Sequence, residues 1–202
     1  MTRVLVTSFE PFGGHEVNSS SEVGRALAPL DGVEVVWSSL PVVAGACIER
    51  AWERVEAHRP GLVLALGQAG SSPQVRLEDR GVNFDHFWMP DNAQQVRRSS
   101  AVLPEGPAVL RTTIPLLEVV ERLRQDGQPV EVSYSAGSYV CNHYYYQLLH
   151  RSTPPTRVLF VHLPLLPEQM KPNVPAFAMP LGRQVECVRR VLRACLSDEL
   201  PG

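Results

Sequence analysis

The chain has 202 residues, of which 44% are hydrophobic and 20% are charged, ordinary values for a soluble globular protein. This length can bury one sizeable core, so we expect residues 1–202 to form a single domain. The 19 Lys and Arg residues nearly balance the 21 Asp and Glu residues, for a formal net charge of −2, which argues against nucleic acid or an anionic membrane as a partner.

Cysteine usage and the absence of targeting signals bear on the cellular compartment. No stretch reaches the ~20 apolar residues that a membrane span needs, and the N-terminus lacks the pattern of a secretory signal peptide. The sequence contains no CxxC pair, and its cysteines are too sparse for a disulfide framework, which predicts free thiols. We therefore expect a cytoplasmic protein. The cysteines are Cys47, Cys141, Cys187 and Cys195.

Short apolar, β-branched runs alternate with segments of helical periodicity along the chain. The expected elements are, in chain order, strand 3–7, strand 33–37, helix 44–58, strand 62–66, helix 114–125, strand 130–134, a helix at Cys141, strand 157–162 and helix 181–196. Because several strands are apolar on both faces, the alternation predicts an α/β layer fold with a mostly parallel, twisted central sheet.

The stretch from Ser71 to Pro107 interrupts this alternation. Residues 74–84 have the pattern of a β-hairpin, and irregular loop is expected after them. Loops of this length in a compact domain are often functional.

Ligands of open α/β sheets bind beyond the carboxyl ends of the strands. Two glycine-containing segments, 8–14 and 67–70, follow predicted strands directly, as does the turn before Cys141, and His162 ends the last strand. We expect these features to converge on one edge of the sheet.

Cys141 is the foremost candidate for a nucleophile. It follows a turn at Gly137 and opens a helical segment, where the positive end of the helix dipole favours the thiolate. The other cysteines lie in helical contexts that suit small buried hydrophobic residues.

A nucleophilic thiol needs a base, and His162 is the best placed of the six histidines. His143 is only two residues from Cys141 on the same helix, so its ring should point to a different side. An acidic group usually orients such a base. Glu78 and Asp79 are the candidates, and their spacing also fits a solvated charge cluster.

The segment Phe9-Glu10-Pro11-Phe12-Gly13-Gly14 either lines a pocket or covers the edge of the core. The segment Gly67-Gln68-Ala69-Gly70 lacks the residues of a phosphate-binding loop and the spacing of a dinucleotide fingerprint. No group of His, Cys, Asp and Glu has metal-ligand spacing either, so no cofactor or metal is expected.

Motifs spread along almost the whole chain resemble the pyroglutamyl peptidase I family of cysteine peptidases. The motifs are Phe9-Glu10-Pro11-Phe12-Gly13-Gly14 with Val17-Asn18, Gly67-Gln68-Ala69-Gly70, Glu78 with Asn83, Pro90-Asp91-Asn92, Glu105-Gly106-Pro107, Ser135-Ala136-Gly137-Ser138-Tyr139-Val140-Cys141-Asn142 and Val161-His162-Leu163-Pro164. The resemblance rests on the order and spacing of these motifs more than on any single motif.

The resemblance implies an enzyme that removes an N-terminal pyroglutamyl residue from peptides. Cys141 would be the nucleophile, His162 the general base and acid, and Glu78, rather than Asp79, the group that orients His162. The implied fold is a single-domain α/β/α sandwich, and many members of the family form homotetramers. The implied substrate-binding residues are Phe9, Phe12, Asn18, Gln68, Tyr139 and Val140.

The chain departs from the family pattern at two places near this site. Asp79 adds a negative charge that could raise the pKa of Glu78 or His162. Phe87-Trp88-Met89 stands where the family commonly has an Arg before Pro90-Asp91-Asn92. A cysteine amidase with another acyl specificity and a non-catalytic binding protein are therefore the alternatives, and a thiol-redox role is weaker because no resolving cysteine lies near Cys141 in sequence.

Overall fold

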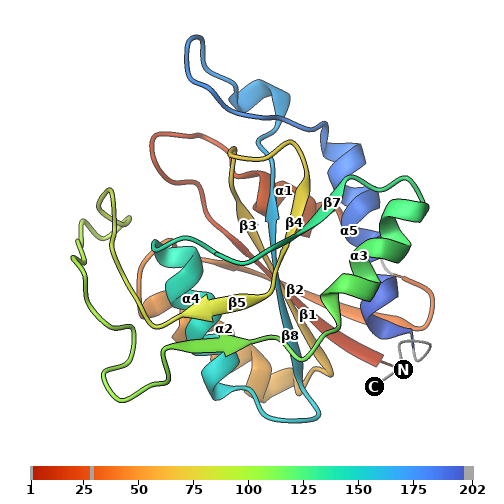
Figure 1. The fold of residues 1–202 in the computed structure, drawn as a ribbon, viewed down its shortest axis with the longest axis horizontal. Coiled ribbons are helices and arrows are strands. Elements are labelled where there is room, and N and C mark those ends of the chain that lie inside the picture. Colours follow the sequence, from red (N-terminus) through yellow and green to blue (C-terminus); the bar gives the residue numbers. More distant parts are fainter. Residues whose placement is uncertain (1, 28–29, 198–202) are drawn as a thin grey trace.

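A computed structural model of the protein describes residues 2–27 and 30–197. The core of the fold is a six-stranded sheet with helices packed on both faces, so the predicted α/β/α sandwich is confirmed (Figure 1). The strands of this sheet are β1 (Thr2–Phe9), β2 (Val33–Leu40), β3 (Leu62–Gln68), β4 (Val75–Glu78), β7 (Val130–Ser133) and β8 (Arg157–Leu163). The helices are α1 (Ser19–Ala26), α2 (Ala46–His58), α3 (Leu116–Gln125), α4 (Val140–Arg151) and α5 (Leu181–Leu196), with a 3-10 turn η1 (Pro167–Gln169).

The strand order is β2-β1-β3-β8-β4-β7, and every neighbouring pair is parallel except β4 with β8. The mostly parallel sheet predicted from the alternation is therefore confirmed. In β1, β3 and β8 nearly every residue is buried, because both faces of these strands are covered and their sequences read as continuous apolar runs.

Two apolar clusters cover the two faces of the sheet. One joins the sheet to α1, α3 and α5, and the other joins it to α2 and α4. None of the helices within the described residues is long and apolar enough to cross a membrane.

The hairpin expected over residues 74–84 is wrong. β4 joins the central sheet between β8 and β7, whereas β5 (Arg80–Val82) pairs with β6 (Val109–Arg111) in a separate two-stranded sheet. The chain changes partner at Asp79, whose N–H donates to the Ser133 carbonyl at 2.7 Å and whose carbonyl accepts from Thr112 at 3.0 Å. Alternating polarity continues across this break, so the pattern reads as one hairpin.

Helix α1 was not among the predicted elements. Its sequence, SSSEVGRA, has three serines and a glycine and little apolar periodicity. It is fixed instead by Asn18, which caps the helix by accepting from the Ser20 N–H at 3.0 Å.

The segment from Asn83 to Ala108 is irregular, as expected, except for a bridge between Asp85 and Ser100. Asp91 organises this segment. One of its carboxylate oxygens accepts from the N–H groups of Ala93 and Gln95, both at 2.9 Å, and the other accepts from Ala44 at 3.1 Å. The loop is thereby attached to the chain just before α2.

Candidate active site

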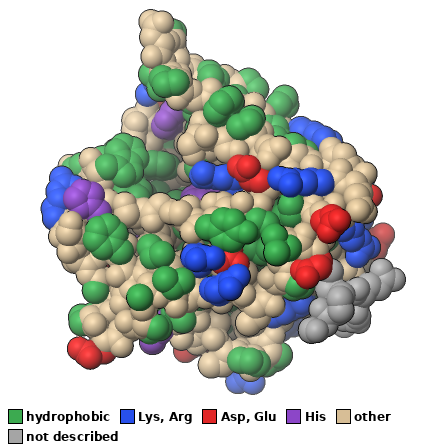
Figure 2. Space-filling model, in the orientation of Figure 1, with side chains coloured by type: hydrophobic (Ala, Val, Ile, Leu, Met, Phe, Trp, Pro, Cys, Tyr) green, Lys and Arg blue, Asp and Glu red, His purple; other side chains and the backbone are tan. Residues whose placement is uncertain are grey.

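The four sequence features expected to converge do so, in one cleft at the carboxyl ends of β1, β3 and β8. Figure 2 shows acidic and basic side chains interspersed over the part of the surface that carries α3 and β7. Residues that line the cleft are Phe12, Gly13, His15, Gln68, Ala69, Gly70, Ser71, Arg76, Trp88, Met89, Ser135, Ala136, Gly137, Ser138, Tyr139, Cys141, His162, Leu165, Pro175 and Ala176.

Cys141 is the second residue of α4, as the sequence predicted. Its thiol lies in the first turn, where backbone N–H groups point out of the helix and the dipole is positive. It is partly exposed at the cleft, whereas Cys47, Cys187 and Cys195 are buried. Burial raises the pKa of each of these three thiols to about 12. Cys141 is therefore the only cleft-lining cysteine in the described part of the chain.

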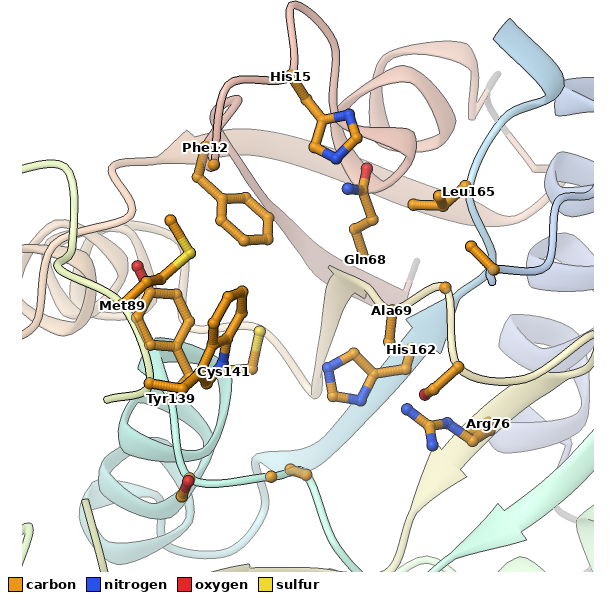
Figure 3. Close-up of a pocket in the computed structure, with 18 of the residues that line it drawn as sticks. Phe12, His15, Gln68, Ala69, Arg76, Met89, Tyr139, Cys141, His162 and Leu165 are labelled. Carbon is orange, nitrogen blue, oxygen red and sulfur yellow. The ribbon is translucent and has the colours of Figure 1, made fainter. Parts of the chain in front are cut away.

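His162 lies near the end of β8 and is 5% exposed. Its ring lies beside the thiol of Cys141 (Figure 3), and its Nδ1 lies 2.7 Å from Oε1 of Glu78. Burial disfavours the imidazolium, but hydrogen bonding to Cys141 and Glu78 outweighs it and raises the pKa of His162 to about 9. The ring is thus held between the Cys141 thiol and the Glu78 carboxylate.

Gly67 leaves room for the His162 ring because it has no side chain. It pairs with His162 across β3 and β8. A Cβ at this position would lie 2.6 Å from the ring of Phe160 and 3.1 Å from Cδ2 of His162. The close approach of the two strands at the site therefore requires glycine.

Glu78, not Asp79, contacts His162. The Glu78 side chain is fully buried and its Oε2 has no hydrogen-bond partner, while Oε1 faces His162. Asp79, the next residue of the chain, instead binds Arg80 at 2.8 Å and Arg111 at 2.8 and 3.1 Å. Although burial opposes ionisation of Asp79, these two guanidinium groups lower its pKa. The second negative charge is therefore paired with arginines outside the cleft.

His143 points away from Cys141, as predicted. Its ring is buried, with Nδ1 2.7 Å from Oδ2 of Asp85 and Nε2 2.7 Å from the Gln147 amide. Asp85 also binds Arg97 at 3.1 Å. This cluster links α4 to the loop that carries Trp88, so His143 has a structural explanation.

A narrow recess lies beside Cys141. All six residues expected to bind substrate line it. Its lining is Phe9, Phe12, Asn18, Val42, Gln68, Tyr139, Val140 and Cys141.

The two phenylalanines of the first loop differ in their surroundings. Phe9 is 3% exposed and packs against the rings of Tyr144 and Phe160, so it belongs to the core as well as to the recess. Phe12 lies at the mouth, with its ring 6.0 Å from that of Tyr139. The hydroxyl of Tyr139 donates to the Pro90 carbonyl at 3.0 Å.

Asn18 and Gln68 are the polar residues with amide side chains in the lining of the recess. Asn18 donates to the Glu10 carbonyl at 3.0 Å, which fixes the first loop. Oε1 of Gln68 accepts from the Ser19 N–H and from the Gln169 side chain, both at 2.8 Å. The side chains of Asn18 and Gln68 are therefore used to fix neighbouring backbone.

Several cleft residues were not identified from the sequence. Arg76 shares a face of β4 with Glu78, two residues away, which is the one signal that could have placed it at the site. Leu165, Pro175 and Ala176 follow β8, where no periodicity marks a cleft, whereas Trp88 and Met89 belong to the segment whose departure from the family pattern had placed it near the site. Within residues 2–27 and 30–197, no group of three or more His, Cys, Asp and Glu residues could hold a metal ion.

Comparisons with known proteins agree with this site. The family model for pyroglutamyl peptidase matches residues 2–198. A pyrrolidone-carboxylate peptidase of Chromobacterium violaceum is 40% identical over 98% of this chain and 94% of its own length. One from Streptomyces coelicolor is 40% identical over 96% and 92%.

Solved structures are similar as well. The pyrrolidone carboxyl peptidase of Fervidobacterium islandicum has a TM-score of 0.90 and 37% identity, covering 95% of this chain and 97% of that one. A mutant pyrrolidone carboxyl peptidase of Pyrococcus furiosus has a TM-score of 0.92 and 28% identity, covering 98% and 100%. The chain belongs to the pyroglutamyl peptidase family of cysteine peptidases.

Proposed function

We propose that Cys141, His162 and Glu78 are the catalytic triad with which this peptidase hydrolyses the amide bond after an N-terminal pyroglutamyl residue. The observation that carries the proposal is the position of His162. Its ring lies between the Glu78 carboxylate, at 2.7 Å, and the Cys141 thiol at the start of α4. A nucleophile, a base and an orienting acid in this order are the requirements of nucleophilic acyl transfer.

The reaction divides into two steps. The Cys141 thiolate attacks the pyroglutamyl carbonyl, the C–N bond breaks, and the His162 imidazolium gives its proton to the departing amine. His162 then removes a proton from water, the resulting hydroxide attacks the thioester, and pyroglutamate leaves as the Cys141 thiolate is restored. Glu78 keeps Nδ1 of His162 protonated, so that Nε2 faces the reacting groups.

Backbone N–H groups at the start of α4 would stabilise the oxyanion of both steps. Within the described residues, the amides of Val140 and Cys141 donate to no protein acceptor, because they open the helix. Donors of this kind, fixed before the reaction, are worth about 2.7–4 kcal/mol each in acyl transfer.

The lining of the recess supports a preference for a pyrrolidone ring. The ring is flat, small and uncharged, and Phe9, Phe12 and Tyr139 offer it apolar surface. Main-chain groups of Gln68 and Val140 are the expected partners of the lactam, because the Gln68 side chain is already engaged. A charged α-amine would lose its hydration in the same space, which is costly.

A substrate panel under reducing conditions tests this function. Amides of one fluorogenic amine with pyroglutamic acid, proline and alanine differ only in the acyl group. We expect release of the amine from the pyroglutamyl amide alone. Preference for another acyl group would favour the altered-specificity alternative, and no turnover by folded, reduced protein would favour the binding protein.

We also propose that residues 1–202 act as one catalytic domain, of which the described residues are 2–27 and 30–197. The support is that all three triad residues come from β4, β8 and the helix α4 packed on the same sheet. A cytoplasmic location fits a reduced thiol nucleophile, since all four cysteines are free. Fractionation of the source cells would test the location.

We propose a homotetramer because the family resemblance implies one. The segment after β8 carries apolar side chains with large exposed fractions, 52% for Val174 and 48% for Phe177. Exposed apolar groups of this kind are common where protein surfaces meet.

A further inference from the structure

Arg76 is a cleft residue that the proposed triad does not use. It lies on β4, pairs with His162 of β8 across the sheet, and lines the cleft with a side chain that is 21% exposed. Among the described residues that line this cleft, it is the only Lys or Arg. A cation in this place is either a structural partner of a neighbouring carboxylate or a ligand for substrate.

The protein leaves most of the hydrogen-bonding capacity of Arg76 unused. Its one ion pair among the described residues is a long contact, 4.0 Å from Nε to Oε1 of Glu78, an oxygen that already faces His162. Glu131 lies beside Arg76 on the adjacent strand β7, but its carboxylate accepts from the Ser72 hydroxyl at 2.8 Å and makes no ion pair with Arg76. A guanidinium carries five N–H donors in a planar fork, and Arg76 donates none of them in a hydrogen bond to the described residues.

The position of Arg76 relative to the other site residues indicates which part of a substrate it meets. In Figure 3, Phe12 and Tyr139 lie on one side of Cys141, and His162 and then Arg76 lie on the other. An acyl group in the recess places its carbonyl at Cys141 and its leaving nitrogen toward His162. The rest of the leaving residue then extends toward Arg76.

We infer that Arg76 is a specificity-determining residue that binds a carboxylate of the leaving residue. In a pyroglutamyl dipeptide the terminal carboxylate is attached one carbon from the leaving nitrogen. The aspartate side chain of an amidated substrate would supply the same group from a different position. Arg76 therefore favours short or acidic leaving groups over neutral amides, an inference that rests on the proposed function.

The test compares the kcat/KM of three substrates: pyroglutamyl-alanine, its amide, and pyroglutamyl-aspartic acid with an amidated main-chain carboxyl. In Arg76→Gln we expect the ratio of pyroglutamyl-alanine to its amide to fall roughly 10-fold, mainly through KM, because a hydrogen bond to a charged group is lost. A fall confined to the third substrate would place the side-chain carboxylate, rather than the terminal one, on Arg76.

Arg76→Lys keeps the charge without the planar fork. It should retain part of the parent's preference for pyroglutamyl-alanine over its amide. Arg25→Gln, which removes an equal charge from α1, should keep the parent ratio. Added salt should lower the ratio in the parent, which checks the inference without any variant, and should leave the ratio of Arg76→Gln unchanged.

Equal losses of kcat on all three substrates in Arg76→Gln would show that Arg76 acts only through Glu78 and would overturn the inference. Ratios within twofold of the parent would overturn it as well, while leaving the proposed function intact. If the parent cleaves none of the three substrates, the proposed function itself fails, and the inference with it.

Discussion

At the residue scale, two neighbouring carboxylates have separate roles because their partners differ. Glu78 is fully buried beside His162, and Asp79 binds Arg80 and Arg111. Adjacent residues at the end of a strand point in opposite directions, so Glu78 reaches His162 and Asp79 does not. The sequence alone could not choose between them, since one arginine partner of Asp79, Arg111, comes from β6, far along the chain.

Glu78→Gln should lower kcat at least about 100-fold, because the amide orients His162 poorly and no longer stabilises the imidazolium. The parent should lose activity as pH rises through about 9, where His162 gives up the proton needed by the leaving amine. Removing the Glu78 charge lowers the pKa of His162, so this alkaline limb should move to lower pH. A pH profile of kcat/KM measures the shift.

Asp79→Asn is the matched control for that profile. It should leave the alkaline limb in place and cost about 1–2 kcal/mol of stability, since the arginines lose a carboxylate partner but are partly screened by water. Because the pKa of Asp79 is lowered in the folded protein, this contribution is present at neutral pH and is lost as pH falls through the lowered pKa. An alkaline limb that moved equally in both variants would contradict the assignment of Glu78.

Phe9 and Phe12 should respond differently to truncation. Phe12→Ala should raise KM for a pyroglutamyl amide with little change in thermal midpoint, because Phe12 lies at the mouth of the recess. Phe9→Ala should cost about 3–5 kcal/mol of stability, since Phe9 is also packed in the core. Unchanged KM in folded Phe12→Ala would contradict its place in the pocket.

At the scale of elements, the position of α4 depends on polar contacts to the chain after β4. Asn142 accepts from the Val82 N–H and donates to the carbonyls of Val82 and Phe84, each at 2.9 Å. Gly81 packs so closely on α4 that a Cβ would lie 2.8 Å from Cα of Tyr146. These contacts fix the helix whose first turn carries Cys141.

Asn142→Ala should therefore lower both stability and activity. It leaves the Val82 N–H and the Phe84 carbonyl without their partner, whereas the Val82 carbonyl still accepts from the Phe84 N–H at 2.8 Å. A single buried unsatisfied group costs about 1–3 kcal/mol. Denaturant unfolding and kcat, measured on the same sample, check this. Full stability with parent kcat would show that α4 is held by its apolar face alone.

Strands and helices with strong periodicity were predictable, and elements fixed by single polar residues were not. Helix α5 occupies the residues expected for it, 181–196, because its apolar positions recur on one face. Helix α1 depends on the cap at Asn18, and β5 depends on β6, a strand of three residues far along the chain. Neither the hydrophobic periodicity nor the composition of a segment indicates a single capping residue or a distant strand partner.

At the scale of the molecule, the sheet topology brings the site together. Cys141, His162 and the first loop could be placed at one edge from the sequence because parallel strands end on the same side. Arg76 was not placed there, because β4 runs antiparallel to β8 and enters the sheet out of sequence order, so only its spacing from Glu78 marks it. The shape of the recess could not be predicted either, because it depends on how the first loop packs beside the start of α4.

The proposed assembly has a direct test in solution. Light scattering coupled to size exclusion should give four times the chain mass of 22.4 kDa. Replacing Phe177 by Glu should shift the mass toward that of the monomer, because a charge on an apolar contact costs desolvation. A parent mass equal to one chain at all concentrations would contradict the tetramer.

The central claim is that Cys141 is the nucleophile of a pyroglutamyl peptidase. The measurement that tests it most directly is the rate of amine release from a pyroglutamyl amide under reducing conditions, for the parent, Cys141→Ala and Cys187→Ala. We predict turnover by the parent and by Cys187→Ala, whose altered thiol is buried away from the cleft, and none by folded Cys141→Ala. Turnover by Cys141→Ala at a rate close to that of the parent would contradict the account.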